Sequence, residues 1–200
     1  ISNYPDLIRA LALVKQAAAR ANRDLGVLSA EKADIIDKVC ARIADGEWHD
    51  QFVVGVVQGG AGTSTNMNAN EVIANAGLQM MGCELGEYQA LHPIDDVNRS
   101  QSTNDVYPTA IKLAMVFGLR RLLTEHALLI ESFAAKSREF ENVLKVGRTQ
   151  LQDAVPMTLG QEFAGYAGML DDNLGRLAFA RDGLMPLAIG GTAVGTGLNA

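Results

Sequence analysis

The hydrophobic residues of this chain recur mostly at helical spacing. In residues 5–24, the small and aliphatic side chains that share one helical face are Leu7, Leu11, Val14, Ala18 and Ala21. Pro5 suits the first turn of such a helix, and Gly26 predicts its end. Ser29 is typical of an N-cap, so we predict a second helix that runs from there to about Gly46.

Longer helical patterns follow along the chain. They cover residues 66–81, 108–140 and 159–185, and Thr158 predicts the cap of the last one. A helix over 108–140 would span roughly 50 Å at about 1.5 Å per residue, a length typical of helical bundles. Residues 52–57, Phe-Val-Val-Gly-Val-Val, predict a strand or an extended buried segment. We therefore predict an all-α chain in which 108–140 and 159–185 run antiparallel, with at most a minor strand or hairpin near 52–57.

Small hydrogen-bonding side chains cluster where the longest helical pattern begins. The stretch 100–109 reads Ser-Gln-Ser-Thr-Asn-Asp-Val-Tyr-Pro-Thr, in which Asp105 suits a helix cap and Pro108 a first turn. Residues 102–104 would then lie just before the helix N-terminus, where free N–H groups and the helix dipole favour an anion. The alternative is that this stretch only caps the helix.

Comparable polar clusters occur at 58–71, after Gly147 and at 190–199. The first resembles half of a dinucleotide-binding fingerprint, but Thr65 replaces the third glycine and no strand–helix alternation follows. The absence of a lysine after the glycines also excludes a phosphate-binding P-loop. The donors of the second cluster are Thr149, Gln150 and Gln152. The third cluster predicts the start of a further helix.

Composition and spacing exclude several function classes. A net charge of −6 without a basic run argues against a nucleic-acid surface, and no apolar run is long enough to span a membrane. Cys40 and Cys83 form no CxxC pair, which favours a reducing cytoplasm. No cluster of residues has metal-ligand spacing, and the absence of a G-x-S-x-G sequence argues against a serine nucleophile on a strand-to-helix turn. A chain that starts at Ile1 and stops in a glycine-rich stretch suggests a piece of a longer protein.

Uncharged donors at several helix starts suit a small polyanion. They would hold a carboxylate and stabilise the negative charge that develops when a proton leaves its α-carbon. Four segments carry a resemblance to a known family: QGGAGTSTNMNANEVIAN (58–75), SQSTNDVYPTA (100–110), GRTQLQDAVPMTLGQEF (147–163) and GGTAVGTGLN (190–199). They resemble the aspartase/fumarase superfamily of elimination enzymes, most closely the aspartate ammonia-lyases and next the class II fumarases.

The resemblance implies an all-α fold, with a small N-terminal domain over residues 1–103 and the first part of a long-helix central domain over 104–200. It implies a homotetramer and a reversible elimination of ammonia from L-aspartate to fumarate, without metal or cofactor. The substrate-binding positions that it implies are Thr63, Ser102, Thr103, Asn104, Thr149 and Gln150. Of these, Thr149 and Gln150 would reach the substrate from a neighbouring subunit. The family's catalytic serine would lie beyond Ala200, so no catalytic base is expected in this chain.

Two departures from the fumarase pattern bear on specificity. Gln150 stands where fumarases usually carry a histidine, which favours an aspartase. His92, which we expect to be extended before Pro93, begins a sequence that resembles the fumarases' secondary carboxylate site. Ile94 replaces an asparagine of that site, which argues against its function here. A class II fumarate hydratase and a non-catalytic helical scaffold remain the alternatives.

Overall fold

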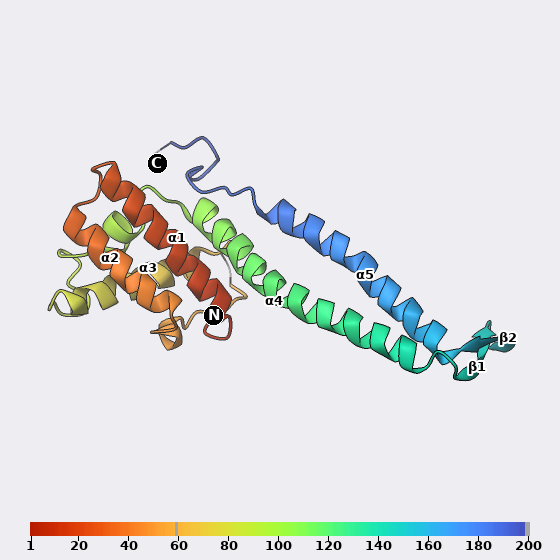
Figure 1. Cartoon of the computed structure of the whole chain (residues 1–200). Coiled ribbons are helices and arrows are strands. Elements are labelled where there is room, and N and C mark those ends of the chain that lie inside the picture. Colours follow the sequence, from red (N-terminus) through yellow and green to blue (C-terminus); the bar gives the residue numbers. More distant parts are fainter. Residues whose placement is uncertain (59, 199–200) are drawn as a thin grey trace. The chain divides into compact units, whose positions relative to one another are not determined.

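The computed structural model describes residues 1–58 and 60–198, and helices dominate the chain (Figure 1). The α-helices are α1 (Pro5–Asp24), α2 (Ala30–Ala44), α3 (Thr63–Met80), α4 (Thr103–Glu139) and α5 (Leu159–Leu184). The short helices are η1 (His49–Gln51) and η2 (Pro93–Val97), and the strands are β1 (Leu144–Thr149) and β2 (Gln152–Thr158). The prediction of an all-α fold is confirmed apart from this pair of strands.

The chain forms two compact units. One comprises Ile1–Met115 together with the segment that starts at Pro186, and the other comprises Val116–Met185. The predicted boundary between residues 103 and 104 stays a prediction about domains of the whole protein. None of the helices in the described residues is both long enough and apolar enough to cross a membrane.

Helices α1 and α2 pack together in the first unit, as their patterns predict. Helix α1 ends at the predicted place, because Gly26 adopts a left-handed φ of +72°. Ser29 caps α2, and its hydroxyl oxygen accepts the N–H of Lys32. The largest apolar side chains buried between the helices and their neighbours are Ile8, Leu11, Ile36, Val39 and Ile43.

Helix α3 begins at Thr63, three positions earlier than the sequence pattern predicts. Gly62 precedes it with a φ of +88°, and a Cβ at this position would lie 2.0 Å from the ring of Tyr107. Only glycine tolerates both the positive φ and the close approach of the Tyr107 ring. Gly62 therefore lets the start of α3 approach the start of α4 closely.

The prediction of a strand or an extended buried segment at 52–57 is wrong. Phe52 is buried, but Val53 is 77% exposed and Val57 is 95% exposed. The segment adopts bends, and none of its residues belongs to a strand. A β-branched run forms a strand only where another strand pairs with it, and among the described residues the strands are Leu144–Thr149 and Gln152–Thr158.

Helix α4 begins at Thr103, five positions before Pro108, so the predicted cap is also wrong. Ser102 precedes the helix, and its carbonyl accepts the N–H groups of Asp105 and Val106. Its hydroxyl accepts the N–H of Asn104 at 3.2 Å. Asp105 lies within the first turn, where its carboxylate accepts the N–H of Ser102 at 3.0 Å. The sequence pattern placed the helix too late because small polar residues fill its first turn.

In the second unit the end of α4 and α5 run antiparallel, as predicted. His126 meets the carbonyl of Leu170 at 2.8 Å, and the ring of Phe163 packs against Phe133 and Phe140 at 5.8 and 5.5 Å. Thr158 caps α5 as predicted, in a capping box with Gln161.

Strands β1 and β2 form an antiparallel hairpin between these two helices (Figure 1). Leu144 pairs with Thr158, and Thr149 pairs with Gln152 at the turn. Sequence analysis did not predict this hairpin, because its polar residues resembled a donor-rich loop.

Candidate functional site

The first turn of α4 brings together the three consecutive donors that the sequence singled out. Thr103 is half-buried and Asn104 is exposed, and both lie within the helix, not before it. Asn104 donates from Nδ2 to the carbonyl of Ala193 at 2.8 Å. The hydroxyl of Thr103 accepts from Nδ2 of Asn66 at 3.0 Å. These donors therefore lie at a helix N-terminus that Ser102 caps, and binding of an anion there stays a prediction.

The glycine-rich segment from residue 190 also lies at this helix start. Asp105 is 1% exposed, and its second carboxylate oxygen accepts the N–H of Thr192 at 2.8 Å. Thr192 has a left-handed φ of 56° and donates to the carbonyl of Leu198. The described part of this segment consists of turns, and Asn199, where we expected a further helix to open, lies outside the described residues. Asp105 therefore joins two of the predicted polar clusters.

Thr63 lies in the first turn of α3 with an exposed side chain. The close contact of Gly62 with Tyr107 brings this turn to the start of α4. Two buried side chains of the same turn face inward: Thr65 accepts from Gln58, and Asn66 donates to Thr103. The starts of α3 and α4 thus form one polar surface in the first unit. Gly59, part of the same motif, lies outside the described residues.

Thr149 and Gln150 lie in the second unit, at the tip of the hairpin, and both are exposed. Gln150 and Leu151 have φ values of 52° and 63°. Such a two-residue turn usually carries Asn-Gly, because a side chain at positive φ is strained. These two residues belong to a different unit from the other predicted substrate-binding residues. Strained backbone of this kind tends to occur at functional sites, which makes the tip a candidate in its own right.

A group of buried polar residues behind Thr103 was missed by sequence analysis. Oδ1 of Asn98 accepts from Nζ of Lys15 at 2.7 Å, from Asn66 at 3.0 Å and from Asn70 at 3.2 Å. Lys15 is fully buried, and this burial lowers its pKa to about 7. The signal in the sequence was a lysine on the apolar face of α1, one turn from Leu11.

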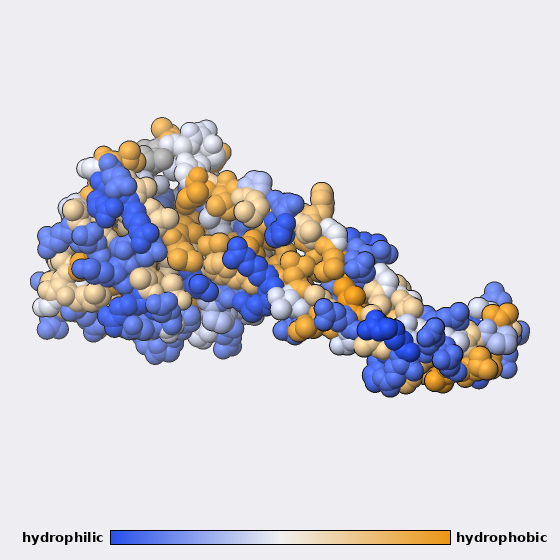
Figure 2. Space-filling view, in the orientation of Figure 1, coloured by the Kyte–Doolittle hydropathy of each residue, from blue (hydrophilic) through white to orange (hydrophobic). Residues whose placement is uncertain are grey.

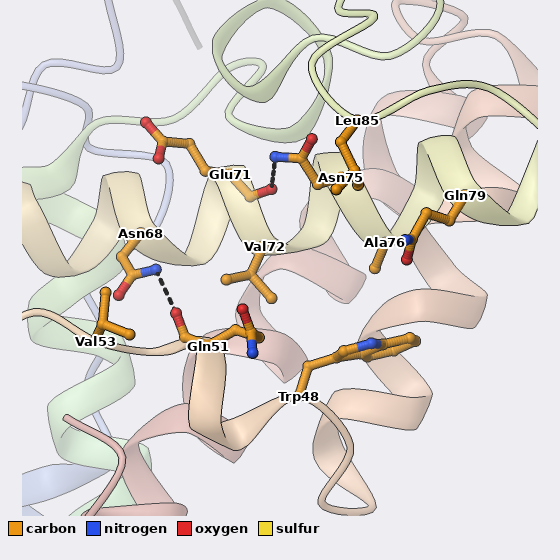
Figure 3. A pocket seen from close by; sticks show the side chains of 10 residues that line it. All are labelled: Trp48, Gln51, Val53, Asn68, Glu71, Val72, Asn75, Ala76, Gln79 and Leu85. Carbon is orange, nitrogen blue, oxygen red and sulfur yellow. Dashed lines mark hydrogen bonds between the residues drawn. The ribbon is translucent and has the colours of Figure 1, made fainter.

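An open pocket of about 540 Å³ lies elsewhere in the first unit (Figure 3). It is lined by Trp48, Gln51, Val53, Asn68, Glu71, Val72, Asn75, Ala76, Gln79 and Leu85. Its amides serve the fold: Asn68 donates to the carbonyl of Gln51 at 3.1 Å, and Asn75 to the carbonyl of Glu71 at 2.9 Å. None of the predicted substrate-binding residues lines it, so we place the candidate site at the helix starts.

Two further predictions concern histidine and metal sites. His92 is extended as predicted, and its Nδ1 accepts the backbone N–H groups of Ile94 and Asp95. The ring thereby stabilises η2, and the absence of a working carboxylate site at His92 stays a prediction. In the part of the chain that the structure describes, no three His, Cys, Asp or Glu side chains gather to hold a metal ion.

Comparisons with known proteins identify the family of the chain. A family model described as lyase matches residues 4–200. The chain belongs to this lyase family. It is 59% identical over 201 residues to an aspartate ammonia-lyase of Pseudomonas canavaninivorans and 48% identical over 200 residues to that of Escherichia coli. Each match covers 100% of this chain and 42% of the relative, so the chain spans less than half of their length.

Solved structures of other proteins are similar to this chain in fold. A fumarate lyase:delta crystallin from Brucella melitensis, solved with cobalt bound, superposes with a TM-score of 0.97 at 53% identity. That match covers 100% of this chain and 44% of the other. A class II fumarase from Schistosoma mansoni superposes with a TM-score of 0.92 at 38% identity, over 98% of this chain and 41% of the other.

Proposed function

We propose that this chain is part of an aspartate ammonia-lyase, which reversibly eliminates ammonia from L-aspartate to give fumarate. The observation that carries the proposal is that relatives of this name share 48–59% identity with the chain over its whole length. Because the chain spans about 42% of those relatives, the activity is proposed for the whole protein. The domains predicted at 1–103 and 104–200 belong to the same proposal.

The chemistry of the helix starts supports this reaction. Removal of a proton from C3 of aspartate pushes an electron pair onto the adjacent carboxylate, which becomes a dianion before the C2 amine leaves. Thr63, Ser102, Thr103 and Asn104 offer hydroxyl, amide and helix N-terminal donors to such a group. Preorganised donors stabilise this charge in the transition state more than they stabilise the substrate. The serine base is expected outside this chain.

Thr149 and Gln150 complete the proposed site from a neighbouring copy of the protein. Their place at the exposed tip of a hairpin, beside a turn at positive φ, suits delivery to another chain. A homotetramer in the cytoplasm, acting without a cofactor, is the assembly that we propose.

A class II fumarate hydratase is the second candidate, because both enzymes grip the same dicarboxylate. The solved class II fumarase is 38% identical to this chain, below the values for the aspartate ammonia-lyases. The experiment is to express the full-length protein and compare initial rates on L-aspartate and L-malate by the absorbance of fumarate. We expect turnover of aspartate only. Preferential turnover of malate would favour the fumarase, and no turnover of either would favour a non-catalytic scaffold.

A further inference from the structure

We propose that Lys15 is a positioning residue for the hydroxyl of Thr103, and that it acts through the side chains of Asn98 and Asn66. The proposal rests on the proposed function, in which Thr103 donates a hydrogen bond to the substrate's carboxylate. Lys15 itself lies on α1, fully buried behind the site, and takes no part in the chemistry.

The chain of hydrogen bonds starts at a group that donates. Nζ of Lys15 carries N–H donors in either protonation state, and it donates to the carbonyl oxygen of the Asn98 amide at 2.7 Å. The nitrogen of the same amide then donates to the carbonyl of Gln101 at 3.2 Å. Lys15 and the carbonyl of Gln101 therefore fix together which way the Asn98 amide faces, a choice that an amide alone leaves open.

The fixed oxygen of Asn98 in turn orients the next amide. It faces Nδ2 of Asn66 at 3.0 Å, so Asn66 must present its nitrogen to this side. The same nitrogen donates its second hydrogen to the hydroxyl oxygen of Thr103, also at 3.0 Å. Asn66 is 1% exposed, so bulk water does not reach its amide.

The last step concerns the hydroxyl hydrogen of Thr103. A hydroxyl has one donor and two acceptor positions, and Asn66 occupies an acceptor position. The hydrogen of Thr103 is left to point away from Asn66 as a donor. A carboxylate at the start of α4 needs such a donor, and a donor that is oriented in advance costs no reorganisation during the reaction.

The alternative is that Lys15 and its partners only hold the first unit together. Asn70 allows the two roles to be separated. It is buried like Asn66, lies one turn away on α3 and donates to the same oxygen of Asn98 at 3.2 Å. Its other contact is a long one to the sulfur of Met67, so it has no contact with Thr103 that would carry the effect to the hydroxyl.

The test uses this matched pair in the full-length enzyme. We expect Asn66→Leu to lower kcat/KM for L-aspartate roughly tenfold to a hundredfold, because the Thr103 hydroxyl loses its fixed orientation. We expect Asn70→Leu to change it by less than about threefold, although both variants lose one hydrogen bond to Asn98. Equal losses in the two variants, or a loss confined to Asn70→Leu, would overturn the proposal.

A double-mutant cycle tests Lys15 itself. If Lys15 acts through Thr103, Lys15→Met should lower kcat/KM roughly tenfold in the native background and by less than about twofold when Thr103→Val is already present. If Lys15→Met lowered kcat/KM by the same factor in both backgrounds, Lys15 would have only a structural role. That result would overturn the positioning proposal and leave the proposed function standing. Normal turnover by Thr103→Val would overturn the site itself and with it this proposal. Should Lys15→Met not fold, the comparison of Asn66→Leu with Asn70→Leu decides.

Discussion

At the scale of single residues, the residue that caps α4 differs from the residue that we propose to bind the substrate. Ser102 supplies the cap, whereas Asn104 is exposed and makes one contact with the carbonyl of Ala193. We expect Asn104→Ala to lower kcat/KM by roughly 10²–10³-fold and to leave the melting temperature nearly unchanged, because a preorganised donor is lost but a cap is not. Paired kinetics and thermal unfolding of the full-length variant check this. A clearly lowered melting temperature with near-normal turnover would return Asn104 to a structural role.

Gly62 is the residue at which the backbone constrains the site most strongly. Alanine there would place a Cβ 2.0 Å from the ring of Tyr107, at a φ of +88°. We expect Gly62→Ala to destabilise the protein by more than about 2 kcal/mol and to reduce activity, because the starts of α3 and α4 must separate.

Gly55 offers the control for that substitution. A Cβ at Gly55 would meet its nearest atom at an ordinary 3.6 Å, so Gly55→Ala should change the free energy of unfolding by less than about 0.5 kcal/mol. Urea unfolding measures the free energy of unfolding of Gly62→Ala and of Gly55→Ala. Equal stabilities would contradict the account of Gly62.

The buried Lys15 should make the free energy of unfolding depend on pH. Burial lowers its pKa from 10.5 to about 7, against the raising effects of Cys40 and Asp105. Between these values the unfolded state binds more protons than the folded state, so the free energy of unfolding should rise with pH. The slope is at most about 1.4 kcal/mol per pH unit for one group.

Lys15→Met serves as the reference, since it removes the titrating group while keeping an unbranched apolar side chain. We expect urea unfolding between pH 7 and pH 10 to show a smaller rise with pH in Lys15→Met than in the native protein. Parallel pH dependences would show that Lys15 titrates normally in the folded state.

At the scale of elements, the hairpin between α4 and α5 holds its tip in a strained conformation. Glycine at Leu151 would relieve the positive φ of 63° and should stabilise the hairpin by roughly 1 kcal/mol. Leu151→Gly should keep most of the activity, whereas Gln150→Gly relieves similar strain but removes a proposed substrate contact and should lower kcat/KM more than tenfold. Equal activities of the two variants would argue against a binding role for Gln150.

The elements also show what the sequence could predict. Helices α1, α2 and α5 follow from apolar periodicity and from the caps at Ser29 and Thr158, which are local signals. The sequence pattern predicts the starts of α3 and α4 too late, since their first turns carry polar residues and lack the apolar periodicity of the later turns.

The features that the sequence patterns do not predict depend on contacts with other segments and not on local propensity. The segment 52–57 has strand propensity but no pairing strand, so it stays irregular. The β1–β2 hairpin forms because its two halves pair across a turn that its side chains disfavour. The network of Lys15 joins residues up to 83 positions apart, and no local pattern reports it.

At the scale of the whole molecule, the second unit leaves large apolar side chains in water (Figure 2). Those at least 44% exposed on its helices are Leu122, Leu128, Leu129, Met169 and Phe179. Exposed apolar surface of this extent marks an interaction face. We expect the full-length protein to associate into a tetramer, which light scattering at micromolar concentration measures. A monodisperse monomer would contradict this.

The central claim is that the whole protein breaks the carbon–nitrogen bond of L-aspartate. The most direct measurement incubates the full-length protein with L-aspartate and follows ammonia and fumarate in the same reaction. We predict that both products appear at equal rates, and that Thr103→Val slows both by the same factor. Fumarate without ammonia, or neither product from a folded and assembled protein, would contradict the account.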